Sequence, residues 1–539
     1  APARETSEKE AVTLTTALGR SQIFSLSHES DGTLQLTNTD AIGLETITNR
    51  GKDDSHEQLL ADGTVITRTL GPDPRFGMLA PVVEQITIST GGHTMIVAGE
   101  RTVQASATNP LSAEIQTDTV TVNGHRYVAT LDKTVSPATL TRTTPLGRVA
   151  VTELDEKGRP TSMSLVTAQG FAPVQLTYDD GSVNPLHTGL VRTMSRSDGT
   201  DTRTYLFDYD SDGNLVAVTD PLSRTVSYNH DAARRVTTQI LPDNEDVRFG
   251  YDANDNLTTL AQPGSPLLFQ PSDVHVHDFT DLDMLGTYTA PDIGLASHTT
   301  AWDYDLDHDV DTITKPDGRI INPSFLADGR LDQLVIPAAT VTLAYYPVTD
   351  PSAPGKLQSV SESADSQTLT FAYAGQLVTQ ETYAGPAAGA VAWTHDDDLR
   401  LASEAVNGDA IAFGYDDDGL LTSAGQLSVT RHPQSGTIDA TTVGNVTEAV
   451  SYNGFGERSA SDFAYSSSSI YALALARDLA GRIRFKTETL PAGTVGHEYR
   501  YDLAGRLEEV YQGAGDCQQI VCPLVASYAY DANGNRTSV

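Results

Sequence analysis

The stretch RYDLAGRLEEV at residues 500–510 contains the pattern that decides the fold. It begins with an aromatic–aspartate pair, passes through a glycine and an arginine, and ends in an alternation of apolar and polar residues. Such an alternation, with a period of two, is typical of a half-buried strand. The Asp-x-x-Gly core is typical of a tight turn, because glycine accepts a positive φ and aspartate can bond to backbone N–H groups ahead of it. The stretch therefore predicts a strand, a turn and a second strand.

The same pattern recurs along the chain. Copies stand at residues 207–220, 250–260, 414–425 and 529–539, and weaker ones lie near Gly158, Asp231, Gly329 and Gly481. The strong copies assign a structural role in the repeat to Tyr209, Asp210, Gly213, Tyr251, Asp252, Tyr415, Asp416, Gly419, Tyr501, Asp502, Gly505, Tyr530, Asp531 and Gly534. Tyr209, Tyr228 and Tyr251 are 19 and 23 residues apart, which leaves room for two strands and two turns. Successive hairpins are therefore expected to stack side by side.

Stacked hairpins predict an all-β fold with one long antiparallel sheet. Because twist accumulates from strand to strand, a sheet of this length must curl. We expect it to spiral into a hollow shell or an open barrel.

Longer stretches strengthen the comparison with a known family. Four stretches match the family's sequence pattern in the same order along the chain: TDPLSRTVSYNHDAARRV at 219–236, TKPDGRII at 314–321, VNGDAIAFGYDDDGLL at 406–421 and ARDLAGRI at 476–483. In these stretches and in the repeats, the chain resembles the YD repeats of the Rhs family, which also occur in teneurins and in cage components of insecticidal toxin complexes. The resemblance covers residues 145–539 and extends more faintly through 72–81. It implies a sheet that spirals into a cocoon whose lumen holds another polypeptide.

The resemblance also sets an expectation for the end of the sequence. Self-cleaving members carry an Rhs-associated core after the repeats and then a variable toxin. This sequence ends at YDANGNRTSV, inside another repeat, so we expect the core and the toxin domain to be absent from it. Either the gene product is longer, or this is a stand-alone member.

The first part of the chain differs from the rest. Residues 1–140 show alternating strand patterns and DGT turns at 31–33 and 62–64, but no clean Tyr-Asp unit. Divergent repeats with a capping role are favoured over a separate plug domain. We therefore predict an N-terminal β region at 1–140 and a YD-repeat β-shell at 141–539.

Charge and hydropathy limit the partners and the location. The net charge of −36 repels phosphate backbones, so we expect no nucleic-acid partner. No run approaches eighteen apolar residues, so we expect no membrane span. The sequence begins with Ala and shows no leader, which fits a mature secreted chain. We expect a bacterial protein that is secreted, extracellular or displayed on the cell surface.

Two cysteines, Cys517 and Cys522, have four residues between them. They are either unrelated thiols or, in a secreted protein, a small disulfide loop. No further zinc ligands stand nearby.

Two acidic stretches suggest cations. Asp208, Asp210 and Asp212 match the opening of a calcium loop, but the twelfth position is Thr219 in place of a bidentate glutamate. A turn with solvated aspartates is favoured over a Ca²⁺ site. The alternating aspartates at positions 303, 305, 307, 309 and 311 would share one strand face, which must then be solvated, bulged or cation-binding.

The weak catalytic candidates are His275 and His277, which would share one strand face with Asp273. The pair could bind a transition metal or act as an acid or base, and with a tyrosine it could abstract the proton α to a uronate carboxyl. The resemblance of HDFTDLDMLGTY, which begins at His277, to a family stretch favours a structural role. No phosphate loop, nucleophile elbow or H-E-x-x-H helix is present.

Three functions remain open. The first is a secreted or cell-surface shell or scaffold, part of a larger Rhs-type polypeptide that encloses or presents a C-terminal effector, with no catalysis of its own. The second is a secreted polysaccharide-degrading lyase or hydrolase that uses the concave sheet face. The third is an adhesion or carbohydrate-binding module that exposes Trp302 and Trp393. The expected partners are an enclosed polypeptide or a cell-surface protein, or else a polysaccharide, and the shell is favoured.

Overall fold

The computed structural model describes residues 9–538 except 107, 110, 168, 183, 265–273, 293–296 and 514–521. In this part the protein contains 46 strands and one single-turn 3-10 helix, η1 (Pro185–His187). Contacts divide the chain into two compact units. Unit 1 comprises residues 1–134 and 300–425, and unit 2 comprises residues 135–299 and 426–539. None of the described helices is long and apolar enough to cross a membrane.

The strands of unit 1 come from both of its segments. The first segment contains β1 (Lys9–Thr15), β2 (Ser21–His28), β3 (Leu34–Thr39), β4 (Glu45–Arg50), β5 (His56–Leu59), β6 (Val65–Asp73), β7 (Gly77–Thr90), β8 (His93–Ala105), β9 (Ala113–Val122) and β10 (His125–Asp132). The second contains β24 (Thr299–Tyr304), β25 (Val310–Thr314), β26 (Ile320–Phe325), β27 (Leu331–Ile336), β28 (Ala339–Tyr345), β29 (Leu357–Glu362), β30 (Gln367–Ala374), β31 (Leu377–Ala384), β32 (Gly389–His395), β33 (Leu401–Val406), β34 (Asp409–Tyr415) and β35 (Leu421–Ala424).

Unit 2 is built in the same way. Its first segment contains β11 (Ala138–Thr143), β12 (Val149–Leu154), β13 (Pro160–Val166), β14 (Val174–Tyr178), β15 (Val191–Ser197), β16 (Thr202–Tyr209), β17 (Leu215–Thr219), β18 (Thr225–His230), β19 (Val236–Ile240), β20 (Asp246–Tyr251), β21 (Leu257–Ala261), β22 (His275–Phe279) and β23 (Leu285–Thr289). Its second contains β36 (Leu427–Arg431), β37 (Ile438–Val443), β38 (Val446–Tyr452), β39 (Arg458–Tyr465), β40 (Ser468–Arg477), β41 (Ile483–Leu490), β42 (Gly493–Tyr501), β43 (Leu507–Gln512), β44 (Leu524–Ser527), β45 (Ala529–Tyr530) and β46 (Arg536–Ser538).

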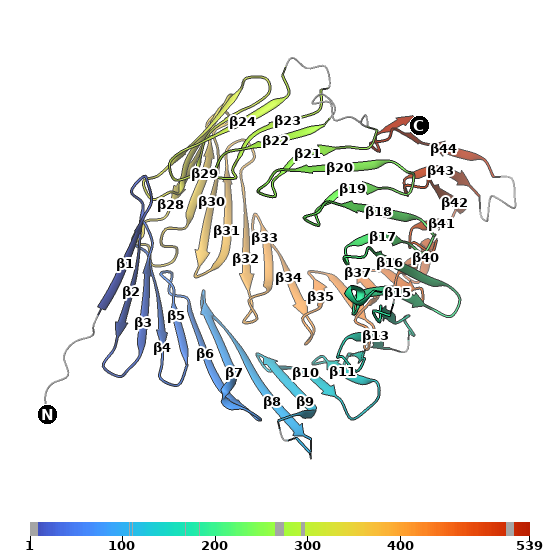
Figure 1. Ribbon diagram of the computed structural model, residues 1–539, viewed down its shortest axis with the longest axis horizontal. Coiled ribbons are helices and arrows are strands. Elements are labelled where there is room, and N and C mark those ends of the chain that lie inside the picture. Colours follow the sequence, from blue (N-terminus) through green and yellow to red (C-terminus); the bar gives the residue numbers. More distant parts are fainter. Residues whose placement is uncertain are drawn as a thin grey trace. The chain divides into compact units, whose positions relative to one another are not determined.

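Pairing follows the order of the chain. Within each segment, strands pair antiparallel with their sequence neighbours, as β41, β42 and β43 do (Figure 1). Forty-four of the described strands belong to one antiparallel sheet, and β45 and β46 form a separate hairpin. The predicted all-β fold of stacked hairpins is confirmed. The predicted domain division at residue 140 stays a prediction.

The aspartate of each repeat organises its turn. Asp502 accepts hydrogen bonds from the Arg506 backbone N–H at 2.8 Å and from the Arg506 Nε at 2.7 Å. Gly505 has a φ of 90°, which the turn requires and only glycine adopts without strain. In the copies at Asp210, Asp252 and Asp531, an asparagine four residues later donates from its side chain instead. The carboxylate thus replaces the hydrogen-bond partners that the turn's backbone lacks.

The tyrosine joins its hairpin to the preceding one. The Tyr501 hydroxyl donates to the Ile483 carbonyl at 2.7 Å, and the Arg482 guanidinium lies 4.2 Å from the centre of its ring. Equivalent bonds run from Tyr209, Tyr251, Tyr415 and Tyr530 to Val191, Val236, Leu401 and Leu507. The sequence Tyr-Asp-x-x-Gly-Arg therefore links each turn to its neighbours by an Asp–Arg–Tyr chain.

A β-bulge accompanies these tyrosines. The register shifts at Tyr209, Tyr251, Tyr415 and Tyr501, because the partner strand carries one extra residue there. A bulge increases the local right-handed twist and bends the strand. The repeat motif thus bends the sheet locally at regular intervals.

The phenol bond yields a first prediction. Tyr501→Phe removes one half-buried hydrogen bond while keeping the ring, so we expect the free energy of unfolding to fall by about 1 kcal/mol. Tyr465→Phe, at a tyrosine that is 53% exposed, serves as the matched control and stays within about 0.5 kcal/mol of the wild type. Urea denaturation followed by far-UV circular dichroism measures both. Equal stabilities of the Tyr501 variant and the wild type would show that the phenol bond is not part of the repeat's energetics.

In unit 1 the turns of the two segments meet along a line that we call the unit 1 seam. Side-chain bonds join Arg20 to Asp309, Lys356 to Asp62 and Asn123 to Asp398, across 289, 294 and 275 residues of sequence. Because these separations are nearly constant, the two rows of turns lie side by side in the same order.

Unit 2 has a corresponding line, the unit 2 seam. Arg203 donates two hydrogen bonds to the Glu457 carboxylate at 2.8 and 2.9 Å, across 254 residues of sequence. Arg506 lies 3.5 Å from Asp243, across 263 residues. Bonds between turns thus join the two segments of each unit, and few apolar side chains of the described residues are buried.

Very little of the protein is buried. The accessible surface is 30039 Å², against about 19,000 Å² expected for a compact monomer of this mass. The buried apolar residues of the described part are Ala113, Ala172, Ala261, Val274, Ala353, Phe455 and Val510. A sheet that is a single layer thick, with solvent on both faces, accounts for the excess surface.

Candidate functional site

The strand registers give the first arc of unit 2 two unlike faces. One face, which we call the aromatic face, runs from β14 to β23 and carries Leu176, Met194, Tyr205, Phe207, Val218, Val226, Tyr228, Gln239, Val247, Phe249, Leu260, His275, His277 and Tyr288. The other, the hydroxyl face, carries Thr177, Thr193, Ser195, Thr204, Thr219, Thr225, Ser227, Thr238, Thr259, Thr287 and Thr289. Period-two alternation along each strand produces this division.

The aromatic face is not covered by another layer. All fourteen of its side chains are only half-buried. Soluble proteins rarely leave a contiguous apolar patch of more than a few hundred Å² open to water, and larger ones mark interaction sites. The face is therefore a candidate surface for binding another polypeptide.

Unit 1 repeats the arrangement. From β27 to β34 one face carries Leu334, Val341, Leu343, Val360, Leu369, Phe371, Tyr383, Val391, Trp393 and Ile411. Trp393 donates its Nε1–H to Glu404 at 3.1 Å, and both it and Trp302 are half-buried. Neither indole is presented as a freely exposed ring.

A cluster of titratable side chains lies at the β22–β23 end of the aromatic face. The structure brings both predicted histidines beside Tyr288. Nδ1 of His275 lies 2.6 Å from the Tyr288 hydroxyl, and its Nε2 lies 2.8 Å from the Gln262 amide nitrogen. The His277 ring lies 5.2 Å from the Tyr288 ring, directly across the β22–β23 ladder. We call Gln262, His275, His277 and Tyr288 the His–Tyr cluster.

Burial governs the charge of this cluster. Partial burial, and then the proximity of His277, lowers the pKa of His275 below its ordinary value. His275 is therefore neutral at pH 7, with one ring nitrogen donating and the other accepting. Nδ1 of His277 is buried and has no hydrogen-bond partner in the described structure.

The cluster meets only part of the requirement for uronate elimination. An imidazole and a phenol in contact can pass a proton between them. Removing a proton α to a carboxylate also needs a positive group to hold that carboxylate. The structure thus shows the imidazole–phenol contact that a proton relay needs, and uronate elimination stays a prediction.

The calcium candidates do not act together. Asp208 is paired with Arg192 at 2.6 Å. Asp210 accepts the backbone N–H groups of Asp212 and Asn214, each at 2.9 Å. Among the described residues, no group of three or more His, Cys, Asp or Glu side chains could hold a metal ion. The Asp210 carboxylate thus serves the turn.

The acidic run at residues 303–311 does not share one strand face, contrary to the expectation. β24 ends at Tyr304 and β25 begins at Val310, so Asp305, Asp307 and Asp309 lie in the turn between them. Arg20 of the first segment lies among these three carboxylates. This turn, with Arg20 as the cation between its carboxylates, thus forms part of the unit 1 seam. The even spacing of the aspartates gives no sign of the turn.

The structure describes only one of the two cysteines. Cys522 is disulfide-bonded. Cys517 lies outside the described residues, as does Asp273. The Cys517–Cys522 loop stays a prediction.

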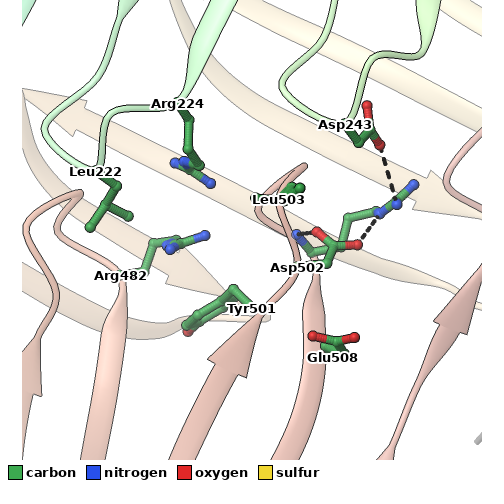
Figure 2. A pocket seen from close by; sticks show the side chains of 9 residues that line it. Leu222, Arg224, Asp243, Arg482, Tyr501, Asp502, Leu503 and Glu508 are labelled. Atoms are coloured by element: carbon green, nitrogen blue, oxygen red, sulfur yellow. Dashed lines mark hydrogen bonds and ion pairs between the residues drawn. The ribbon is translucent and has the colours of Figure 1, made fainter.

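A hollow of about 570 Å³ lies on the unit 2 seam (Figure 2). Arg224, Arg482 and Arg506 line it together with Tyr501 and Leu503. Each arginine is paired with the aspartate of its own turn at 2.6 to 2.8 Å. The hollow is therefore a gap in a row of repeat turns, and its charges are already compensated.

Seam residues were missed by the sequence analysis. Asp62, Lys356, Arg203 and Glu457 carry the contacts between segments, and no motif marks them because their partners lie more than 250 residues away. The DGT turns at 31–33 and 62–64 share one sequence pattern. Nothing local distinguishes the seam turn at Asp62 from the exposed one at Asp31.

Acid should weaken the fold through its aspartates. Bonds from the backbone N–H of Arg75 and from Arg101 outweigh burial and lower the pKa of Asp73 to about 2. Hydrogen bonds from Asn214 and Asn256 lower the pKa values of Asp210 and Asp252. A carboxyl whose pKa is lower in the folded state stabilises the fold above its unfolded pKa, and this contribution disappears as pH falls through the folded pKa.

We therefore expect stability to fall between about pH 5 and about pH 2. In Asp73→Asn the loss of stability relative to wild type should be largest at pH 7 and should shrink toward pH 2. Urea denaturation across this pH range checks the expectation. A difference that stays constant with pH would contradict it.

Comparisons with known proteins agree with this architecture. A family model described as Teneurin YD-shell matches residues 16–539. No curated protein sequence matches the chain. The crystal structure of TcdB2-TccC3 is similar at 10% identity with a TM-score of 0.50, over 98% of this chain and 33% of that one. TcdB2-TccC3 without its hypervariable C-terminal region is similar at 11% identity with a TM-score of 0.50, over 96% and 27%.

A Photorhabdus luminescens Tc holotoxin pore is similar at 10% identity with a TM-score of 0.49, over 88% of this chain and 27% of that one. The chain thus spans about a quarter to a third of the solved chains that it matches. At such identities the likeness shows the fold.

Proposed function

The chain belongs to the Teneurin YD-shell family, and from that membership we propose that it forms the wall of a larger Rhs-type protein that encloses or presents an effector polypeptide. The observation that carries the proposal is the aromatic face, which is extensive, half-exposed and opposed by a hydroxyl face. A non-native polypeptide exposes apolar side chains in no fixed order. A broad apolar sheet can contact such a chain without requiring a specific shape.

The charge of the protein supports the same role. With a net charge of −36, copies of the protein repel one another, which limits association through the apolar face. The structural similarity of this chain to TcdB2-TccC3, a protein with a hypervariable C-terminal region, suggests the source of the effector: a segment encoded beyond the repeats. We propose that the protein acts in a secreted or cell-surface setting and that its role is containment, without catalysis.

Protease protection tests containment. An unfolded reporter peptide is fused after Val539, and the fusion is treated with a protease of broad specificity. If the wall contains the peptide, the fused reporter is cut at least tenfold more slowly than the same peptide added in trans. Protection should vanish in urea concentrations that unfold the sheet.

A fusion of the same peptide to an unrelated soluble protein serves as the control for tethering. Equal cleavage rates for the two fusions would overturn the proposal.

A further inference from the structure

The His–Tyr cluster brings together two imidazoles and a phenol, side chains that can bind transition metals. We propose that His275, His277 and Tyr288 bind one divalent transition-metal ion, copper or zinc, through two imidazole nitrogens and one phenolate oxygen. The inference does not depend on the containment function, because it needs only these three side chains and no contained polypeptide.

The first two donors lie at hydrogen-bonding distance, slightly closer than two ligands of one ion. Nδ1 of His275 and the Tyr288 oxygen are 2.6 Å apart. Two ligands bound to one ion at about 2.0–2.1 Å each are separated by about 2.9 Å at a right angle and about 3.3 Å at a tetrahedral angle, so the two donors must move apart by about 0.3 to 0.7 Å to admit the ion. The ion would take the place of the shared proton, and the phenol proton would pass to solvent, as ligand protons do on metal binding.

The third proposed donor is Nδ1 of His277. His277 stands directly opposite Tyr288 across the ladder, and its buried Nδ1 has no hydrogen-bond partner in the described structure. A buried polar nitrogen without a partner costs free energy, and coordination would recover it. His277 shares a strand face with His275, so both imidazoles approach Tyr288 from β22.

Gln262 contacts the ring nitrogen of His275 that would not bind the ion. Its amide contacts Nε2 of His275 at 2.8 Å. A metal-bound histidine usually donates its other N–H to an acceptor that fixes the ring, and the amide oxygen of Gln262 serves when the amide is turned over. Imidazole nitrogens suit copper and zinc, which fixes the class of ion. The absence of a cluster of three His, Cys, Asp or Glu among the described residues does not bear on this set, because its third ligand is a tyrosine.

The test is a titration of the full chain after treatment with a chelator. Isothermal titration with Cu²⁺ and with Zn²⁺ should show one tight equivalent per chain. His277→Ala should weaken binding at least tenfold, and Gln262→Leu should weaken it about 10–100-fold. With Cu²⁺, a phenolate charge-transfer band in the visible should appear in the wild type and be lost in Tyr288→Phe.

His497→Ala is the matched control. His497 lies beside Tyr499 on β42, with ring centres 6.3 Å apart and a buried Nδ1 without a partner, but it has no second imidazole on its strand. This variant should bind as the wild type does. Circular dichroism verifies that each variant is folded.

Electron paramagnetic resonance of the wild type with Cu²⁺ gives a readout that needs no variant, since two nitrogen ligands should split the signal. No tight equivalent, unchanged affinity in His277→Ala, or a copper signal without nitrogen coupling would each overturn the proposal.

Discussion

Asp62→Ala will lower the free energy of unfolding of unit 1 by about 3–5 kcal/mol. The Asp62 side chain is 2% exposed, and its Oδ2 accepts a hydrogen bond from Lys356 Nζ at 2.7 Å and another from the Gln376 amide. Burial acts to raise the pKa of Asp62, but the bonds from Lys356 and Thr64 outweigh it, so the pKa lies below its ordinary value. Removing the carboxylate leaves a lysine without its counter-charge at the unit 1 seam.

A matched turn provides the control. Asp317 occupies the same position of its turn and accepts the backbone N–H two residues later, as Asp62 does. Its ion pair with Arg319 is exposed, so Asp317→Ala should cost no more than about 1 kcal/mol.

Both tryptophans of the chain, Trp302 and Trp393, lie in unit 1, so their fluorescence during urea denaturation reports this unit. Equal costs for the two variants would contradict the seam as the source of unit 1's stability.

Phe455→Ala will lower the stability of unit 2 by about 3–5 kcal/mol. Phe455 is 5% exposed and is the only large side chain among the buried apolar residues of the described part. The Arg203 guanidinium lies 3.8 Å from the centre of its ring, and the Arg196 guanidinium lies 5.7 Å from it. Truncation leaves a void at the seam and removes the surface on which both arginines rest.

Leu282→Ala is the corresponding control, because Leu282 occupies the same turn position but is 61% exposed. Its cost should stay within about 0.5 kcal/mol. Hydrogen exchange followed by mass spectrometry measures both variants. Faster exchange of β38 and β39 in Phe455→Ala alone is the expected result, and unchanged exchange there would contradict the role of Phe455.

The repeat unit was predictable because its physics is local. Tyr501, Asp502 and Gly505 lie within five residues, and turn and strand follow from side chains that act on their own backbone. Stacking of hairpins follows as well, since each strand must pair with its neighbour. The Tyr501 bond to Ile483 reaches only the preceding hairpin, so it too is a contact between sequence neighbours.

The seams were not predictable from sequence. The bond between Asp62 and Lys356 spans 294 residues, and its register depends on how far the sheet advances before its turns meet again. That distance is the sum of many small bends, and no single residue encodes it. The acidic run shows the same limit. Its alternating aspartates predict a strand face, but its middle is a turn whose partner, Arg20, lies 289 residues away.

The His–Tyr cluster lies between these cases. The placement of His275 and His277 on one face follows from their spacing, and the structure bears it out. Tyr288 comes from the neighbouring strand, and only the register of β22 with β23 brings it there. A hairpin register is set by its turn, so a close analysis of the turn at 280–284 could have found this partner.

On the containment proposal, the aromatic face of unit 2 is the surface that a contained polypeptide covers. Hydroxyl-radical footprinting of the chain with and without the fused reporter tests this most directly. We expect reduced oxidation of Tyr205, Phe207, Tyr228 and Phe249 in the fusion, with unchanged oxidation of the exposed Leu206 on the opposite face. Unchanged oxidation of the four aromatic residues, or protection confined to the hydroxyl face, would contradict it.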